Sequence, residues 1–252
     1  MRHGIRSRCR IFVTGSADGL GRAAAQTLLA DGHEVVVHLR GQQRLGAVED
    51  LLNHGAIAVF GDLSDLRQTE RVADQVNRLG RMDAVIHNAG VYSGRQVLPV
   101  NVVAPYVLTA LITKPNRLVY LSSSMHLSGR PVLEGLDWIG RSESGSYSDS
   151  KLFVTTLAMA IARLWTDVVS SAVDPGWVPT RMGGANAPDD LRLGHRTQEW
   201  LAASQDREAQ ITGGYWHHQR RIEPHAASHD VAFQTELLDR LERATGIALS
   251  RS

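Results

Sequence analysis

Short apolar segments alternate with longer amphipathic or alanine- and leucine-rich segments as far as about residue 175. The run Glu-Val-Val-Val-His-Leu at 34–39 lacks apolar–polar alternation, as is typical of a parallel strand covered on both faces. The pattern predicts an α/β fold with one doubly wound, Rossmann-like parallel sheet and helices on both of its faces. Strands are predicted at 10–14, 34–39, 56–60, 82–87, 117–121 and 167–173, and helices at 20–30, 42–54, 66–79, 97–112 and 147–165.

The pattern loosens after Pro175. No linker divides the chain, so we expect one domain over residues 10–252 after a short lead-in at residues 1–9. We interpret residues 181–219 as a loop that lies over the substrate. A loop, a short helix, a last strand and a closing amphipathic helix are predicted at 183–194, 197–203, 213–217 and 231–244.

The composition, with 43% apolar and 21% charged residues, is that of a globular protein and excludes disordered, fibrous and disulfide-scaffold classes. The 27 basic and 26 acidic residues leave a net charge of +1, so nothing favours nucleic acid or an anionic membrane as a partner. Cys9 is the only cysteine, which excludes an intrachain disulfide. No apolar run approaches the length of a bilayer span. We therefore expect a cytoplasmic protein.

A glycine-rich turn joins the first predicted strand to the first predicted helix. Glycines at such a turn let the backbone approach a pyrophosphate, which the helix N-terminus stabilises through its free N–H groups and its dipole. The spacing TGxxxGxG differs from the GxGxxG of longer dinucleotide enzymes. Many strand–helix turns contain glycine for backbone reasons alone, but the position of this turn favours a dinucleotide site. Its sequence is Thr14-Gly15-Ser16-Ala17-Asp18-Gly19-Leu20-Gly21.

The end of the second predicted strand indicates which ribose the site accepts. An Asp or Glu there usually binds a free 2′-hydroxyl, whereas this chain has Leu39 followed by Arg40. Leu39 cannot accept hydrogen bonds from the ribose, while Arg40 can pair with a 2′-phosphate, and Arg44 could assist. Arg40 could instead be a solvated loop arginine. We expect NADP rather than NAD as the cofactor.

Three serines at 122–124 follow a predicted strand, and Tyr147 and Lys151 open a predicted helix. Tyr and Lys four residues apart share a helix face, and a nearby ammonium group lowers the pKa of a tyrosine toward the neutral range. Such a tyrosine can exchange a proton with a carbonyl or hydroxyl group, while a serine hydroxyl holds the same oxygen. The chain has two lysines against 25 arginines, so this spacing favours a catalytic pair over a surface pair.

Further motifs accompany these residues in a fixed order between residues 10 and 180. They are Thr14-Gly15…Gly19…Gly21, Asp62-Leu63, Asn88-Ala89-Gly90, Asn101, the three serines, Tyr147…Lys151 and Asp174-Pro175-Gly176…Thr180. Together they closely resemble the short-chain dehydrogenase/reductase family. The resemblance implies an enzyme that transfers a hydride between a nicotinamide cofactor and a carbonyl or alcohol carbon of a small-molecule substrate.

The resemblance also implies roles for individual residues. Tyr147 would donate or accept the proton, Lys151 would tune it and bind the nicotinamide ribose, and Ser123 or a neighbouring serine would orient the substrate oxygen. Asn101 would hold a water molecule in a proton relay to Lys151. The cofactor would be bound by Thr14, Gly15, Ser16, Asp18, Gly19, Leu20, Gly21, Arg40, Asp62 (at the adenine edge), Leu63, Asn88, Ala89, Gly90, Tyr147, Lys151 and, around the nicotinamide, Pro175, Gly176, Val178 and Thr180.

Two stretches depart from the spacing that is usual in the family. Residues 90–101 form a shorter stretch, and residues 123–147 a longer one. The longer stretch, with Ser-Ser-Ser-Met-His at 122–126, resembles the retinol-dehydrogenase-like and protochlorophyllide-reductase-like branches, which implies a moderately bulky apolar substrate. Trp177 and Met182 flank the nicotinamide segment and are the first candidates for the substrate pocket.

A non-catalytic dinucleotide-binding sensor of the same fold is the alternative, but a sensor would not need Tyr147, Lys151 and a serine together. No metal is expected, because the histidines near the C-terminus match no compact ligand spacing. Family members commonly pair through the helices that correspond to 97–112 and 147–165, so the resemblance implies a homodimer or homotetramer. The apolar circumference of residues 152–161 agrees with a helix buried by both the sheet and a partner.

Overall fold

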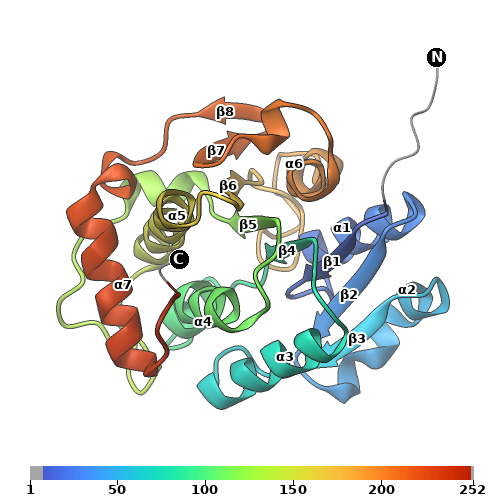
Figure 1. Cartoon of the computed structure of the whole chain (residues 1–252), viewed down its shortest axis with the longest axis horizontal. Helices are drawn as coiled ribbons and strands as arrows, with labels where there is room; N and C mark the ends of the chain where they lie inside the picture. Colours follow the sequence, from blue (N-terminus) through green and yellow to red (C-terminus); the bar gives the residue numbers. More distant parts are fainter. Residues whose placement is uncertain (1–7, 251–252) are drawn as a thin grey trace.

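The computed structural model describes residues 8–250, so residues 1–7 of the expected lead-in lie outside the described part. One eight-stranded sheet has the order β3-β2-β1-β4-β5-β6-β7-β8 (Figure 1). Neighbouring strands are parallel except for the antiparallel pair β7–β8. The predicted doubly wound α/β fold is confirmed. The strands are β1 (Arg10–Val13), β2 (Glu34–Leu39), β3 (Ile57–Phe60), β4 (Ala84–His87), β5 (Arg117–Leu121), β6 (Val169–Asp174), β7 (Gly214–His217) and β8 (Arg220–Ile222).

Helices cover both faces of the sheet. Ile11 and Val13 of β1 are buried in a cluster with α1 and α6, whereas Phe12 is buried in a cluster with α3, α4 and α5, which explains the absence of polar alternation. Within residues 8–250, no helix has both the length and the apolar composition needed to cross a bilayer. The α-helices are α1 (Gly19–Ala30), α2 (Glu49–Asn53), α3 (Leu66–Arg78), α4 (Ala104–Leu111), α5 (Tyr147–Leu164), α6 (Leu191–Ala203) and α7 (Val231–Thr245), and the short 3₁₀ or π turns are η1 (Gln42–Val48), η2 (Pro99–Val103), η3 (Ser124–Ser128), η4 (Glu208–Gln210) and η5 (Ala226–His229).

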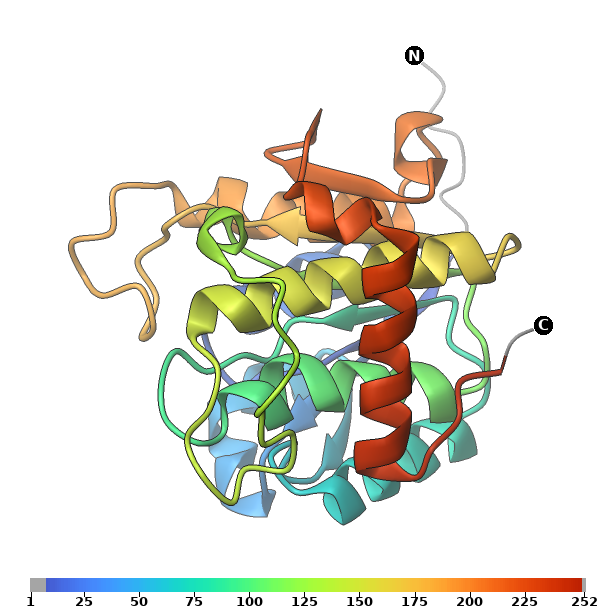
Figure 2. The same ribbon diagram turned by 90° about the vertical axis from the view of Figure 1, so that its left-hand side faces the viewer.

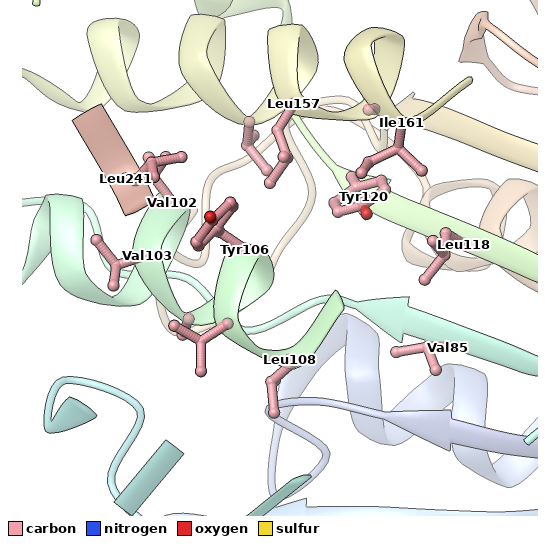
Figure 3. Packing of buried hydrophobic residues seen from close by; sticks show 14 of the residues in the cluster. Val85, Val102, Val103, Tyr106, Leu108, Leu118, Tyr120, Leu157, Ile161 and Leu241 are labelled. Carbon is pink, nitrogen blue, oxygen red and sulfur yellow. The ribbon is translucent and has the colours of Figure 1, made fainter. Parts of the chain in front are cut away.

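The C-terminal helix α7 lies across α4 and α5 (Figure 2). Its Leu241 is buried in the same cluster as Tyr106 of α4 and Leu157 of α5 (Figure 3). The segment after α7 is also fixed, because the Tyr106 hydroxyl donates to the carbonyl of Ile247 over 2.7 Å. Helix α7 therefore covers part of the apolar circumference of α5, a helix for which the resemblance implies a partner.

The predicted helix at 97–112 is entered through a π turn, η2. The backbone N–H of Ala104 donates to the carbonyl of Pro99, five residues earlier. Pro105 has no N–H to donate to the carbonyl of Asn101, four residues earlier, so regular α-helical bonding cannot continue there. The turn places Asn101, a predicted site residue, at an irregular and buried position.

Other segments also differ from the prediction. Residues 42–54 form η1 and then the short α2, with Gly46 lowering helix propensity in the middle of the segment. Much of the predicted substrate loop at 181–219 belongs to the core, because α6 packs against α1 and β5, and β7 lies within the sheet. Strand β8 has no counterpart in the prediction. It follows a two-residue hairpin turn of His218 and Gln219, whose φ angles of 47° and 62° match the left-handed geometry of such turns.

Candidate active site

A cavity of about 1220 Å³ opens at the carboxyl ends of the parallel strands. It spans the point between β1 and β4 where the strand order reverses, which is where open α/β sheets bind ligands. Most of the predicted site residues line it, namely Gly15, Asp18, Gly19, Leu20, Arg40, Asp62, Leu63, Asn88, Ala89, Gly90, Ser123, Tyr147, Lys151, Pro175, Gly176, Val178 and Thr180.

The glycine-rich turn brings its backbone to the cavity. Gly15 and Gly19 have φ angles of 66° and 53°, a region that favours glycine. A Cβ atom on Gly15 would lie 2.9 Å from the Cα atom of Ala89, so a side chain has no room there. Asp18 caps α1 by accepting a hydrogen bond from the backbone N–H of Gly19 at 2.7 Å. The N-terminus of α1 therefore borders the cavity, as a phosphate site requires.

Thr14, Ser16 and Gly21 do not line the cavity, and their contact with a cofactor stays a prediction. Thr14 Oγ1 accepts hydrogen bonds from the backbone N–H groups of Asn88 and Ala89, each at 2.9 Å. The Ser16 hydroxyl donates to a carbonyl at the end of β1, and a Cβ atom on Gly21 would lie 2.3 Å from the amide nitrogen of Asn88. These three residues stabilise the turn through contacts with the neighbouring protein backbone and Asn88. The motif alone does not distinguish this role from contact with a ligand.

Arg40 and Asp62 meet at one end of the cavity. Arg40 Nη2 lies 2.6 Å from Asp62 Oδ2, and the Arg40 side chain is 64% exposed. Burial raises the pKa of Asp62, but hydrogen bonds from Ser64 and Arg40 outweigh burial and hold the pKa below its ordinary value. Gln43 and Arg44 line the same cavity. This end therefore carries several donors for an anionic group.

His38 lines the cavity as well, although no sequence motif indicated it. Its Nδ1 accepts the backbone N–H of Gly15 at 3.1 Å, and its Nε2 lies 2.8 Å from the carbonyl of Gly61. Burial lowers the pKa of His38, so the ring stays neutral and Nδ1 remains an acceptor. The ring thus ties the glycine-rich turn to the end of β3. The sequence feature that could have indicated His38 is the presence of a histidine within an otherwise apolar strand.

Tyr147 and Lys151 lie in the first two turns of α5, at the other end of the cavity. A capping box starts this helix, since Ser146 Oγ accepts from the Asp149 N–H at 3.0 Å and the Asp149 carboxylate accepts from the Ser146 N–H at 2.9 Å. Lys151 Nζ lies 5.4 Å from the centre of the Tyr147 ring and donates to the carbonyl of Leu121 at 2.7 Å.

Burial dominates the pKa values of both groups. It lowers the pKa of Lys151 to about 8, against the opposing charge of Asp174. It raises the pKa of Tyr147 to about 12, against a hydrogen bond with Ser123. The net direction of the Tyr147 pKa is therefore upward, because burial dominates it, and not toward the neutral range that the Tyr–Lys spacing predicts. A protonated tyrosine beside a lysine that titrates near neutral pH can still give a proton to a substrate.

Ser123 is the serine that meets Tyr147. All three serines border the cavity, but Ser123 is the one whose side chain hydrogen-bonds Tyr147. Ser122 is buried, and its Oγ lies 2.6 Å from Thr155 Oγ1. Ser124 is exposed at the start of η3. The geometry therefore favours Ser123 as the residue that faces a substrate oxygen.

Asn101 is buried and does not line the cavity. Its Oδ1 accepts the backbone N–H of Val91 at 2.9 Å, and its Nδ2 donates to the Val91 carbonyl at 3.0 Å and to Ser150 Oγ at 2.9 Å. The side chain therefore fastens the segment after β4 to α5. Its part in a water relay stays a prediction.

Large apolar side chains line the cavity that contains Tyr147. The ring centre of Tyr92 lies 4.9 Å from that of Tyr147, and Met125, Trp177 and Met182 line the same cavity. Trp177 is 62% exposed, yet its indole N–H is held by a backbone carbonyl at 2.8 Å. Trp177 and Met182 were predicted as pocket candidates. Tyr92 and Met125 were not, and the signal for Tyr92 is an aromatic residue two positions after the Asn-Ala-Gly motif.

Comparisons with known proteins agree with this geometry. A family profile described as short chain dehydrogenase matches residues 10–115. The chain is 35% identical to short-chain dehydrogenase chry4 of Gibberella zeae over 95% of this chain and 98% of that protein. It is 27% identical to human retinol dehydrogenase 13 over 69% of this chain and 60% of that protein. A blue fluorescent protein from a metagenomic library, solved in complex with NADPH, has a TM-score of 0.70 and 21% identity over 84% of this chain and 96% of that chain.

These matches have different weight. The likeness to the solved structure concerns the fold, and the likeness to retinol dehydrogenase 13 agrees with the branch that the Ser-Ser-Ser-Met-His segment predicted. The match to chry4 extends over nearly the whole of both chains. The order of the motifs, the doubly wound sheet and the cavity with Tyr147 and Lys151 agree with this match. The chain belongs to the short-chain dehydrogenase/reductase family of oxidoreductases.

Proposed function

We propose that the protein is an NADP(H)-dependent oxidoreductase that transfers a hydride between the nicotinamide and a carbonyl or alcohol substrate, with Tyr147 as the general acid and base. The observation that carries the proposal is the convergence of Ser123, Tyr147 and Lys151 at one end of a cavity whose other end holds Arg40. These groups come from the ends of β2 and β5 and from the start of α5. A structural role alone gives no reason for their convergence.

The volume and the lining of the cavity support a dinucleotide as its ligand. Gly15 and Gly19 line the cavity with backbone beside the N-terminus of α1, whose free N–H groups and dipole favour a pyrophosphate. A Cβ atom on Gly90 would lie 3.6 Å from Lys151 Nζ, so a glycine there leaves room beside the lysine. Arg40 supplies the charge that favours a 2′-phosphate. When bound, the cofactor supplies or accepts the hydride, and the proton step belongs to the protein.

The proton step follows from the geometry around Tyr147. A carbonyl oxygen between the hydroxyls of Ser123 and Tyr147 accepts a hydrogen bond from each. As negative charge develops on this oxygen, Tyr147 transfers its proton to it, while the Ser123 hydroxyl remains a donor. Protonated Lys151, with Nζ 5.4 Å from the ring centre, stabilises the phenolate that remains. In alcohol oxidation the same groups act in reverse, and the phenolate accepts the hydroxyl proton.

The side chains beside Tyr147 support a bulky apolar substrate. Tyr92 stacks near Tyr147, and Met125, Trp177 and Met182 line the same cavity. Aromatic rings and flexible thioethers provide apolar surface that fits flat or irregular groups. We therefore propose that the carbonyl or alcohol group is carried by a ring system or a branched hydrocarbon.

Tyr147→Phe tests the proposal, because it removes the transferable proton and keeps the ring. We expect NADPH-dependent reduction of aryl carbonyls to fall by about 100-fold or more. The Kd for NADPH, measured by nicotinamide fluorescence, should stay within about threefold of the wild-type value. Tyr106→Phe, which alters a buried tyrosine outside the cavity, serves as the control.

Two other outcomes would change the interpretation. Activity near the wild-type level in Tyr147→Phe would contradict the proton-transfer role of this tyrosine. Binding of NADPH without reduction or oxidation of any carbonyl or alcohol would favour the alternative function, a non-catalytic cofactor sensor.

A further inference from the structure

His126 lies three residues after Ser123, in η3, and is fully buried. Its Nδ1 lies 2.7 Å from the backbone carbonyl of Ser123, and its Nε2 lies 3.0 Å from the backbone nitrogen of His225. The His126 ring also packs on Tyr215 of β7, with 4.4 Å between ring centres, and the Tyr215 hydroxyl lies 3.2 Å from Nδ1, farther away than the Ser123 carbonyl. One buried histidine thus connects the serines after β5, the strand β7 and the segment that leads to α7.

The two backbone partners fix the position of the ring proton. A carbonyl oxygen can only accept, so Nδ1 carries the hydrogen and donates it to Ser123. A backbone N–H can only donate, so Nε2 is unprotonated and accepts from His225. Burial lowers the pKa of His126 and keeps the ring in this neutral form. Each ring nitrogen therefore has a separate task.

The bond from Nδ1 acts directly on the backbone of Ser123. The same Ser123 carbonyl accepts the backbone N–H of His126 at 3.0 Å, and Ser123 Oγ accepts the N–H of Met125 at 3.2 Å. The turn is pressed against α5, because a Cβ atom on Gly129 would lie 2.6 Å from the carbonyl of Ser148. These contacts hold the Ser123 hydroxyl near Tyr147. A displacement of about 1 Å at such a position can cost about 100-fold in rate.

We propose that His126 is a positioning residue, whose Nδ1–H bond sets the backbone of Ser123 for the reaction and whose Nε2 bond to His225 anchors the ring to the C-terminal segment. The inference rests on the proposed function, because the placement of Ser123 matters only if Ser123 contacts the substrate oxygen. The turnover rate depends on the donor at Nδ1. The acceptor at Nε2 holds the backbone around His225 and is not required for turnover.

Three substitutions separate the two bonds. His126→Asn keeps a side-chain N–H near the position of Nδ1 and loses the acceptor at Nε2. His126→Gln keeps an acceptor near the position of Nε2 and loses the donor at Nδ1, and His126→Phe loses both. His229→Phe, a substitution at an exposed histidine of η5, is the control, and Tyr147→Phe is the inactive reference.

Turnover is measured as NADPH oxidation with aryl carbonyls that range from benzaldehyde to acetylnaphthalene and phenanthrenequinone. We expect kcat of His126→Asn to stay within about threefold of the wild-type value, and kcat of His126→Gln and His126→Phe to fall about 10- to 100-fold. The Kd for NADPH should be unchanged in all three, which also reports that each variant is folded. The comparison of Asn with Gln does not depend on the folding of the Phe variant.

Amide hydrogen exchange of the protein without cofactor gives a second readout that needs no substrate. Substitution by Gln or Phe should speed exchange in the turn at 122–129 about tenfold or more, and substitution by Asn or Phe should do so at 223–228. This reciprocal pattern distinguishes the two bonds of one ring.

The outcomes separate this inference from the proposed function. Equal kcat in the Asn and Gln variants, or wild-type kcat in the Phe variant, would overturn the positioning role while an inactive Tyr147→Phe keeps the proposed function in place. If the wild-type protein reduces none of the carbonyls, or if Tyr147→Phe is fully active, the proposed function fails. Amide hydrogen exchange at 122–129 then shows, without a measurement of activity, whether His126 stabilises the turn that contains Ser123.

Discussion

Single residues of the candidate site lie in very different surroundings. Lys151 is buried, and burial brings its pKa to about 8. Tyr147 beside it holds its proton, because the same burial raises its pKa to about 12. Arg40, at the opposite end of the cavity, is mostly exposed and paired with Asp62. Substitutions at the two ends should therefore separate cofactor affinity from chemistry and from stability.

Arg40→Ala tests the preference for NADP. Because Arg40 is on the surface, its removal should leave the fold intact and remove a donor for the 2′-phosphate. We expect the Kd for NADPH to rise about tenfold or more and the Kd for NADH to change less than about threefold. Fluorescence titration with both nucleotides measures this, with Arg22→Ala, which breaks a pair with Asp50 outside the cavity, as the control. Equal weakening of both nucleotides would contradict the assignment.

Lys151→Met should lose activity and gain stability. The pKa of Lys151 is about 8 in the folded protein, against an ordinary value of 10.5, so between these pH values the unfolded chain binds more protons than the folded one. The stability of the wild-type protein therefore rises with pH over this range, and below it the cost of burying the charge is complete, at roughly 3 kcal/mol before the lost bond to Leu121 is considered.

We expect Lys151→Met to be more stable than the wild-type protein at about pH 7 and to lose this advantage toward about pH 10. Urea unfolding of both proteins at the two pH values measures the difference in the free energy of unfolding. A variant that is no more stable at neutral pH would show that the buried ammonium group is well compensated.

The role of a residue could be predicted from the sequence where a motif specifies that residue. It could not be predicted where the role depends on how the side chain is buried. The spacing of Tyr147 and Lys151 indicated a reacting pair. The direction of the Tyr147 pKa shift depends on side chains from other elements, so the spacing alone indicated it wrongly. The sequence does not distinguish the three adjacent serines, whereas in the structure Ser122 is bonded to Thr155 and Ser123 is the one that meets Tyr147.

At the scale of elements, the start of α5 determines where Tyr147 lies, because Tyr147 is the first residue of that helix. Ser146→Ala removes half of the capping box and should lower the free energy of unfolding by about 1 kcal/mol. It should also lower kcat several-fold, because Tyr147 follows the cap directly. Urea unfolding and NADPH-dependent turnover measure the two effects.

Asp230→Ala provides a matched control at another helix. Asp230 caps α7 by accepting the backbone N–H of Ala232 at 2.8 Å, and α7 does not border the cavity. Its substitution should cost a similar free energy and leave kcat unchanged. Equal kcat in the two cap variants would show that the cap of α5 does not position the site.

Most strands could be predicted because a buried apolar run is recognisable without its neighbours. Strand β8 could not, since Arg220–Ile222 carries no apolar pattern and forms a strand by pairing with the edge of β7. The π turn before α4 depends on Pro105, which interrupts one hydrogen bond in an otherwise helical segment. The core position of α6 depends on contacts with α1 and β5 that are distant in the sequence.

At the scale of the whole molecule, the face formed by α4 and α5 bears on the oligomeric state. These helices were predicted to pair with another copy, but α7 lies across them, and Leu241 is buried against their cluster (Figure 2). We therefore expect a monomer of 27.6 kDa by light scattering after size-exclusion chromatography at micromolar concentration. A dimer under these conditions would show that a different face mediates pairing.

The position of α7 also affects how the chain is made. Synthesis proceeds from the N-terminus, so α4 and α5 leave the ribosome before residues 231–250 exist. The bond between Tyr106 and Ile247 joins residues 141 positions apart, and until it forms the apolar faces of both helices stay open to chaperones and to other nascent chains. A chain that ends before residue 231 would carry every candidate site residue and still be a target for proteolytic quality control.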